Sequence, residues 1–196
     1  MKILIACEFS GIVRDCFIAM GHNAVSCDIL PTEARGPHHQ GDVLKILNDG
    51  WDMMIAHPPC TYLSTSGLHW NNRQPERALK TEDALLFVEA LWNAPIDRVC
   101  IENPVGCIST RLACMPKPQY IQPYNFGEDA SKKTGLWTRG LPLLVGDSPV
   151  EPRIVDGKSR WDNQSDAGQS RLGGGSGHER SVTYFGIAYA MASQWG

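Results

Sequence analysis

The sequence lacks two features that would assign it to a membrane or to a broadly basic surface. A membrane-spanning helix needs about 20 consecutive apolar residues, and no segment approaches that length. The N-terminal run Met1–Cys7 is too short, and too soon followed by polar residues, for a secretory signal. The formal net charge is -3, so no global positive field indicates tight, non-specific binding to nucleic acid. We therefore expect a cytoplasmic protein with no membrane partner, in which contact with a polyanion depends on a local patch.

Paired cysteines and metal-ligand spacings are also missing. The seven cysteines are odd in number and include no Cys-x-x-Cys, which favours reduced thiols over a disulfide framework. Cys107 and Cys114 are separated by six residues, a spacing that does not suggest zinc. The adjacent pair His38–His39 and the single His57 have no third ligand at a suitable spacing. We therefore predict that the protein has no metal site.

What is present is an alternation of strand patterns and helix patterns. The chain has 196 residues, of which 42% are hydrophobic, enough for one domain with a sizeable core. Strands are predicted at Lys2–Cys7, Asn23–Asp28, Asp52–Ala56 and Arg98–Ile101, with short candidates at Leu136–Trp137 and Leu143–Val145. Helices are predicted at Gly11–Met20 and Pro75–Trp92, a helix or strand-turn-helix at Val182–Trp195, and a short helical or irregular piece at Val43–Asn48. This order is typical of a doubly wound, Rossmann-like α/β sheet. Residues 147–180, rich in Pro, Gly and Ser, are predicted to form a flexible loop within this single domain.

Two short polar motifs each follow a predicted strand. The run Pro58–Thr61 comes after Asp52–Ala56, and Ile101–Pro104 comes at the end of Arg98–Ile101. In an open parallel sheet, the carboxyl ends of the strands deliver residues to a common crevice. Cys60 and Glu102 would then form a nucleophile and an acid suited to attack on a pyrimidine ring. Read separately, a cysteine is often a buried structural thiol, a glutamate a salt-bridge residue, and Asn103-Pro104 a turn.

Weaker signals stand at the ends of the earlier strands. Gly11 lies at the first strand–helix junction, where a glycine lets the backbone approach a ligand. Asp28 ends the second strand, where a carboxylate can accept hydrogen bonds from both hydroxyls of a ribose. Asp42 follows on the same edge and could accept from an adenine amino group. Each residue has a plainer alternative as a turn residue or a helix cap.

In their order and spacing, these residues resemble the catalytic core of the cytosine-C5 DNA methyltransferase family, in particular its small phage- or prophage-type members. The resemblance covers roughly residues 2–137, and the Pro-Cys and Glu-Asn motifs are its specific part. It implies a methyltransferase-type Rossmann-like fold, S-adenosylmethionine as cofactor, DNA as partner and a bacterial or phage-infected host cell. The residues that it assigns to the cofactor are Phe9, Ser10, Gly11, Asp28, Asp42 and Pro58. In this assignment Phe9 stacks on the adenine, Asp28 binds the ribose and Asp42 contacts the adenine.

The chemistry of the specific motifs can be stated in atoms. Addition of the Cys60 thiolate to C6 of cytosine converts the ring to an enamine whose C5 attacks an electrophilic methyl group. Glu102, protonated or sharing a proton with N3, would stabilise the charge that develops on that nitrogen. Asn103 would fix the geometry of the loop, and Pro58 and Pro59 would stiffen the backbone that carries Cys60.

Four further residues are candidates for contact with the substrate. Lys132 and Lys133 stand where the family often has an arginine-containing motif for the base and its phosphate, so the bidentate geometry of arginine is lost. Tyr62 and Arg73 follow the nucleophile and could clamp a base. Alternatively, the lysines form a solvated basic turn, and Tyr62 and Arg73 only pack their own loop.

The match fails in two places. The closing motif of the family has a Gly-Asn pair, where this chain has Gly186-Ile187. Only about forty residues separate Leu141 from Ser181, too few for a large target-recognition domain. Three alternatives stay open: modification of a free pyrimidine nucleotide at C5, amino-group methylation, and a nucleotide-binding module without catalysis. A homo-oligomer or a separate specificity partner is also compatible with the sequence.

Overall fold

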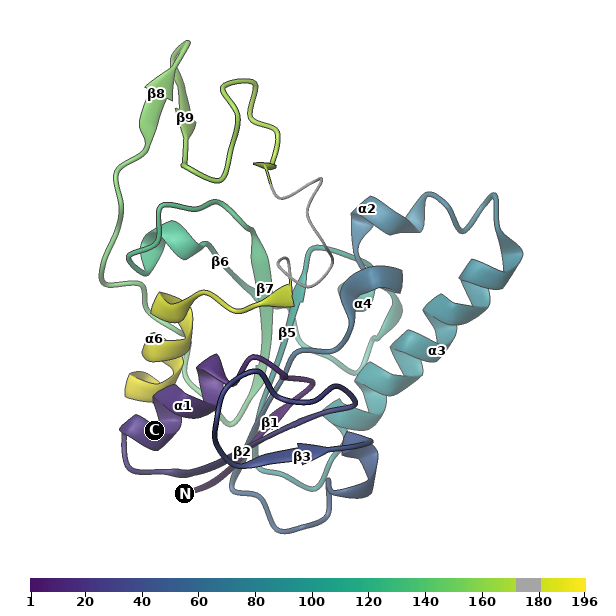
Figure 1. Ribbon diagram of the computed structural model, residues 1–196. Helices are drawn as coiled ribbons and strands as arrows, with labels where there is room; N and C mark the ends of the chain where they lie inside the picture. Colours follow the sequence, from purple (N-terminus) through teal and green to yellow (C-terminus); the bar gives the residue numbers. More distant parts are fainter. Residues whose placement is uncertain (172–180) are drawn as a thin grey trace.

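A seven-stranded sheet with helices on both faces organises the computed structural model (Figure 1), which describes residues 1–171 and 181–196. Its strand order is β3-β2-β1-β4-β5-β7-β6. Strands β1 to β5 are parallel, whereas β7 runs antiparallel to β5 and β6 antiparallel to β7. The strands of this sheet are β1 (Lys2–Ala6), β2 (Asn23–Asp28), β3 (His38–Gln40), β4 (Met53–Ala56), β5 (Arg98–Pro104), β6 (Gln119–Ile121) and β7 (Thr134–Arg139). The prediction of a doubly wound, Rossmann-like α/β fold is confirmed.

The register of the central strands aligns their carboxyl ends. Ala6 pairs with both Cys27 of β2 and Ala56 of β4, and Ala56 pairs in turn with Ile101 of β5. The residues that follow these positions therefore lie side by side at this edge of the sheet, where β1 and β4 end and β5 continues to Pro104. Strand order reverses between β1 and β4, and in such sheets this reversal point is where ligands bind.

The two faces of the sheet are covered by different helices. Helices α1 (Ile12–Ala19) and α6 (Phe185–Trp195) pack together on one face, and the long helix α3 (Pro75–Trp92) covers the other (Figure 1). Ile3 and Ile5 of β1 belong to the core under α1 and α6, whereas Leu4 belongs to the core under α3. This alternation follows from the pleat, because successive strand residues face opposite sides. Each such fully buried aliphatic side chain contributes roughly 1.5–3 kcal/mol.

Short elements complete the described chain. They are the 3₁₀ turns η1 (Val43–Lys45), η2 (Cys60–Tyr62) and η3 (Pro123–Asn125), the short helices α2 (Thr65–Leu68) and α4 (Ile108–Arg111), and the hairpin strands β8 (Arg153–Val155) and β9 (Lys158–Arg160). The β8–β9 hairpin is a separate two-stranded sheet that stands apart from the central one in Figure 1. The flexibility expected for residues 147–180 stays a prediction, and the glycine run 173–177 lies outside the described residues.

Most predicted elements are present, and one is wrong. Pro75–Trp92 is a helix with the expected bounds, and the last helix begins at Phe185. Leu143–Val145 is not a strand. The side-chain amide of Gln119 donates to the carbonyl oxygen of Leu144 over 2.6 Å and its oxygen accepts from the Leu144 amide over 2.9 Å. A single side chain thus satisfies the backbone of Leu144, which a neighbouring strand would otherwise do.

Candidate active site at the carboxyl edge of the sheet

The predicted nucleophile lies on a short, tightly bonded turn after β4. Cys60 begins η2 and is exposed, and its carbonyl oxygen accepts from the amides of Leu63 and Ser64, each over 3.0 Å. Pro58 is buried at the start of this turn. Its carbonyl oxygen accepts a hydrogen bond of 2.7 Å from Nδ2 of Asn103, a side chain that is 1% exposed. The structure therefore ties Asn103 of β5 directly to the backbone that carries Cys60.

The carboxylate of Glu102 lies beside a histidine that sequence reasoning had considered only as a metal ligand. Oε2 of Glu102 is 3.1 Å from Nδ1 of His57, and the two side chains are 16% and 7% exposed. Burial by itself would raise the pKa of Glu102, but the hydrogen bond from His57, the charge of His57 and the charge of Lys132 together lower it below its ordinary value. Glu102 is consequently ionised at neutral pH in this arrangement.

A second buried carboxylate faces the same histidine. Glu8 follows β1 and is 5% exposed. Burial raises the pKa of Glu8, opposed by the charge of His57 and by hydrogen bonds from the amides of Val13 and Arg14. Glu8 and His57 thus follow β1 and β4, and Glu102 lies near the end of β5. These three strands are neighbours in the sheet.

The loop assigned to the cofactor wraps around Glu8. Oε1 of Glu8 accepts from the Val13 amide over 2.7 Å and from the hydroxyl of Ser10 over 3.4 Å. The carbonyl oxygen of Phe9 accepts from the amide of Glu33 over 2.9 Å, which joins this loop to the segment after β2. The Val13 and Arg14 amides at the start of α1 are thus bonded to a protein carboxylate, which takes the place that a ligand charge would have at this helix end.

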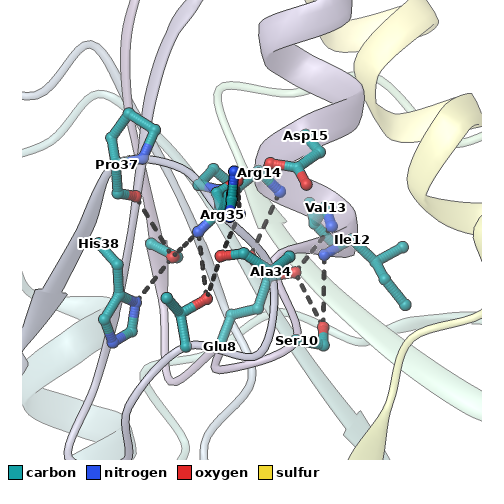
Figure 2. A network of polar contacts seen from close by, with 12 residues as sticks. Glu8, Ser10, Ile12, Val13, Arg14, Asp15, Ala34, Arg35, Pro37 and His38 are labelled. Atoms are coloured by element: carbon teal, nitrogen blue, oxygen red, sulfur yellow. Dashed lines mark hydrogen bonds and ion pairs between the residues drawn. The ribbon is translucent and has the colours of Figure 1, made fainter.

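Gly11 has a packing role that the sequence did not reveal. Its φ is 78°, and a Cβ at this position would lie 2.4 Å from Nη2 of Arg14. Arg14 is fully buried, and Figure 2 shows its guanidinium between α1 and the segment before β3. It donates to Ser26, Thr32 and the carbonyl oxygens of Ala34 and Arg35, over distances from 3.0 to 3.3 Å. A glycine is needed here because the backbone is left-handed and because the arginine occupies the space beside it.

The two acids expected at the cofactor edge do lie together. Burial raises the pKa of Cys7 far above its ordinary value, and the charges of Asp28, Cys27 and Asp42 raise it further, so both acids face the end of β1. Oδ1 of Asp28 accepts from the Leu30 amide over 2.9 Å. Among the described residues nothing donates to Oδ2, which leaves it able to accept from a hydroxyl. Oδ1 of Asp42 accepts from the Leu44 amide over 3.0 Å and caps η1. These acceptor oxygens fit S-adenosylmethionine, whose ribose hydroxyls and adenine amino group donate hydrogen bonds.

The two adjacent lysines point to different places. The charge of Lys132 acts on Glu102, and its Nζ is 5.9 Å from the centroid of the Tyr184 ring. Lys133 is exposed, and its Nζ is 4.4 Å from the centroid of the Tyr120 ring. Of the two, the structure brings only Lys132 to the candidate site.

Tyr62 and Arg73 lie on the segment that follows Cys60. The Tyr62 ring has Arg77 at 4.7 Å and Lys80 at 5.7 Å from its centroid, and these three side chains help to line a cavity of about 500 Å³. Arg73 is exposed and lies 5.5 Å from the Trp70 ring. Nη2 of Arg77 also donates to the carbonyl oxygen of Thr61 over 2.6 Å, so α3 supports the turn that begins at Cys60.

Sequence reasoning missed His57, Glu8 and Arg14 as parts of this site. A signal existed for His57, because it directly follows β4 just as Glu102 follows Ile101 on the neighbouring strand. Glu8 lies one position farther along, two residues after the end of β1. Within residues 1–171 and 181–196, no cluster of three metal-ligating side chains occurs. None of the helices in the same ranges combines the length and the apolar character of a bilayer span.

Comparison with known proteins shows the fold. No family model matches the chain, and no curated protein matches it by sequence. A solved structure of a candidate DNA modification methyltransferase encoded within an Escherichia coli prophage is 14% identical, with a TM-score of 0.51, over 79% of this chain and 53% of that one. The Entamoeba histolytica methyltransferase EhMeth is 16% identical, with a TM-score of 0.49, over 76% and 57% of the two chains. The Dnmt2 methyltransferase of S. pombe is 16% identical, with a TM-score of 0.45, over 72% and 50%. The first of these likenesses confirms the expected methyltransferase-type fold, and the chain spans about half the length of that protein.

Proposed function

We propose that this chain is a member of the cytosine-C5 DNA methyltransferase family and methylates C5 of cytosine through a covalent bond between Cys60 and C6. One observation carries the proposal. Asn103 holds the carbonyl oxygen of Pro58 near the exposed Cys60, and Glu102 is the neighbour of Asn103 near the end of β5. The strand that carries the carboxyl group and the turn that carries the thiol are thereby joined by a buried hydrogen bond.

The protein side of the reaction follows from these positions. As the thiolate sulfur of Cys60 bonds to C6, the electron pair of the C5–C6 double bond moves toward C4 and N3, and N3 takes up a proton. Glu102 is placed to stabilise that change at N3. C5 then becomes the nucleophilic end of an enamine. Once C5 carries a methyl group, loss of its hydrogen to water lets the C5–C6 double bond form again and the sulfur leave. S-adenosylmethionine, when bound, supplies the electrophilic methyl group.

The residues proposed for the cofactor lie on the β1, β2 and β3 side of the reversal point. Asp28 has an acceptor oxygen for ribose, Asp42 stands at the adenine end, and Phe9 offers a ring for stacking. Ser10 and Gly11 shape the loop around Glu8 and Arg14, and Pro58 lies buried at the start of the turn after β4. These assignments are matched to the chemistry of the group and to the order of the strands.

For the substrate we favour cytosine in DNA, contacted by Lys132. Tyr62 and Arg73, on the segment after Cys60, are further candidates for this contact, and Lys133 lies farther away. Modification of a free pyrimidine nucleotide is the second candidate. It is favoured by one observation: between β7 and α6 the described residues hold a two-stranded hairpin rather than a second domain. If DNA is the substrate, a second copy or a separate partner would supply recognition of its sequence. We place the reaction in the cytoplasm of a bacterial or phage-infected cell, where DNA is accessible.

Mass spectrometry of nucleosides tests the proposal. DNA from cells that express the protein should contain 5-methylcytosine, and DNA from cells that express Cys60→Ala should not. Methylation of an amino group, retained in Cys60→Ala, would contradict the proposal. If purified protein methylated free pyrimidine nucleotides at C5 but did not methylate DNA, the result would favour the second candidate.

A further inference from the structure

His57 joins three strands at the point where the sheet order reverses. Its amide donates to the carbonyl oxygen of Ala6 over 2.9 Å, which fixes the end of β4 to β1. Its ring nitrogen Nδ1 reaches Glu102 of β5 over 3.1 Å. The ring is 7% exposed, so bulk water has little access to it. His57 therefore has a fixed orientation, set by partners on both neighbouring strands.

The surroundings of this ring are dominated by negative charge. Glu102 faces it from β5, and Glu8 faces it from the end of β1. Lys132, which precedes β7, is the positive group that acts on the same carboxylate. The second ring nitrogen, Nε2, is buried and has no hydrogen-bond partner among the described residues. Two carboxylates and one enclosed imidazole therefore lie together at this edge of the sheet.

The proposed reaction needs a proton at the place where Glu102 meets the base. N3 of the pyrimidine must gain a proton as the bond between sulfur and C6 forms. The pKa of Glu102 lies below its ordinary value, so at neutral pH this carboxylate carries no proton of its own. Within the described chain, His57 is the group in hydrogen-bond contact with Glu102 that can transfer one.

We propose that His57 is a positioning residue that orients Glu102 and stores the proton which Glu102 delivers to N3 of the pyrimidine. This inference rests on the proposed function, because it needs a base whose C6 is attacked by Cys60. It assigns a role to a side chain that lies outside the Pro-Cys and Glu-Asn motifs. It also explains why a buried, hydrogen-bonded carboxylate can act as an acid in this site.

Over one reaction cycle, each proton returns to the group that donated it or leaves to water. As Sγ of Cys60 bonds to C6, the proton on Nδ1 of His57 moves to the Glu102 carboxylate, and Glu102 passes a proton on to N3. His57 is then neutral and Glu102 is again a carboxylate. When the C5 hydrogen has left to water and the carbon–sulfur bond breaks, N3 returns its proton through Glu102 to His57. The pair ends in the state in which it began, and no additional acid is consumed.

Exchange of the C5 hydrogen of cytosine in deuterated water measures this step without methyl transfer. Reversible addition of Cys60 makes C5 take up a deuteron, which mass spectrometry of the recovered oligonucleotide detects. The variant His57→Asn keeps an amide donor close to the position of Nδ1 but cannot release a proton. We expect it to bind the oligonucleotide as the wild type does and to exchange about 100-fold more slowly. The pH profile of the exchange rate should also differ between the wild type and His57→Asn, because only the wild type can pass a proton through the ring.

Two further variants separate the outcomes. His57→Gln replaces His57→Asn if the latter does not fold, and His39→Asn changes an exposed histidine of β3 as the matched control. Exchange by His57→Asn or His57→Gln at the wild-type rate and with the wild-type pH profile would overturn the role of His57 and leave the proposed function intact. Absence of exchange by the wild type on both DNA and free nucleotides would overturn the proposed function and this inference with it.

Discussion

The side-chain amide of Asn103 donates to the carbonyl oxygen of Pro58 over 2.7 Å inside the protein. This hydrogen bond crosses from β5 to the turn after β4 and is nearly inaccessible to water, because Asn103 is 1% exposed. Since Glu102 precedes Asn103 on the same strand, the bond sets where Cys60 stands relative to that carboxylate. The spacing of two motifs in the sequence thereby becomes a fixed geometry.

Replacing Asn103 by Ala should loosen this connection. The carbonyl oxygen of Pro58 would be left buried without a donor, which costs about 1–3 kcal/mol of unfolding free energy. Activity should fall further than stability, since Cys60 loses its fixed position. Urea denaturation and steady-state kinetics measure the two effects, with Asn72→Ala on an exposed turn as the control. Equal stability and activity in Asn103→Ala and Asn72→Ala would show that the bond does not hold the site together.

The stability contributed by Glu102 should disappear in acid. Its pKa in the folded protein lies below the ordinary value of 4.5, so ionisation of Glu102 stabilises the fold above about that pH and the contribution is lost as the pH falls through the lowered value. The difference in unfolding free energy between the wild type and Glu102→Gln should therefore shrink below pH 4.5.

The stability contributed by Glu8 should change with pH in the opposite direction. Its pKa in the folded protein is raised, so its contribution is greatest below its ordinary value and is lost as the pH rises through the raised one. Relative to the wild type, Glu8→Gln should gain stability as the pH rises from 4.5. Denaturation series between pH 3.5 and 7 measure both variants, and parallel pH profiles for the wild type, Glu102→Gln and Glu8→Gln would contradict the assigned environments.

The adjacent lysines provide a matched pair of variants. Lys132→Met removes a charge that acts on Glu102, whereas Lys133→Met removes one that lies over Tyr120. We expect Lys132→Met to lower kcat/KM for DNA roughly tenfold, equivalent to about 1.4 kcal/mol, and Lys133→Met to have a much smaller effect. Kinetics on one oligonucleotide at fixed ionic strength make the comparison. A greater loss in Lys133→Met would place the substrate on the Tyr120 side instead.

Arg14 should be hard to replace even by another cation. Lys cannot reproduce five donors in a fixed plane, so Arg14→Lys leaves several of the groups in Figure 2 without partners. We expect a loss of about 2–4 kcal/mol in unfolding free energy, seen in thermal or urea denaturation. Arg35→Lys, at an exposed side chain of the same segment, is the control and should change little. Similar stability for the two variants would show that the buried guanidinium network is not important.

The sequence was sufficient for the fold because its signals are local and repeated. Buried strands such as β1 read as short apolar runs, and α3 carries a helical pattern with Pro75 at its first position. The same strand ends then predicted which edge of the sheet holds Cys60 and Glu102. Leu143–Val145 was mistaken for a strand because its apolar residues resemble one, while the side chain of Gln119 that satisfies Leu144 comes from far away in the sequence.

The residues of the site that belong to a motif could be predicted from the sequence. The residues whose position is set by long-range contacts could not. The place of Lys132 relative to Lys133 depends on how the chain enters β7, which two neighbouring identical residues cannot reveal. His57 and Glu8 have no motif of their own, and their role arises only when three strands bring them beside Glu102. Gly11 suggested a ligand-binding loop, yet the space that it leaves is filled by Arg14.

Covalent trapping tests the central claim most directly. A DNA duplex that contains 5-fluorocytosine cannot lose the C5 substituent as a proton, so the bond from Cys60 to C6 should persist after transfer. With S-adenosylmethionine present, denaturing electrophoresis and peptide mass spectrometry should show the duplex attached to Cys60 in the wild type and no adduct in Cys60→Ser. Methylation of cytosine by Cys60→Ser, or an adduct on any residue other than Cys60, would contradict the account.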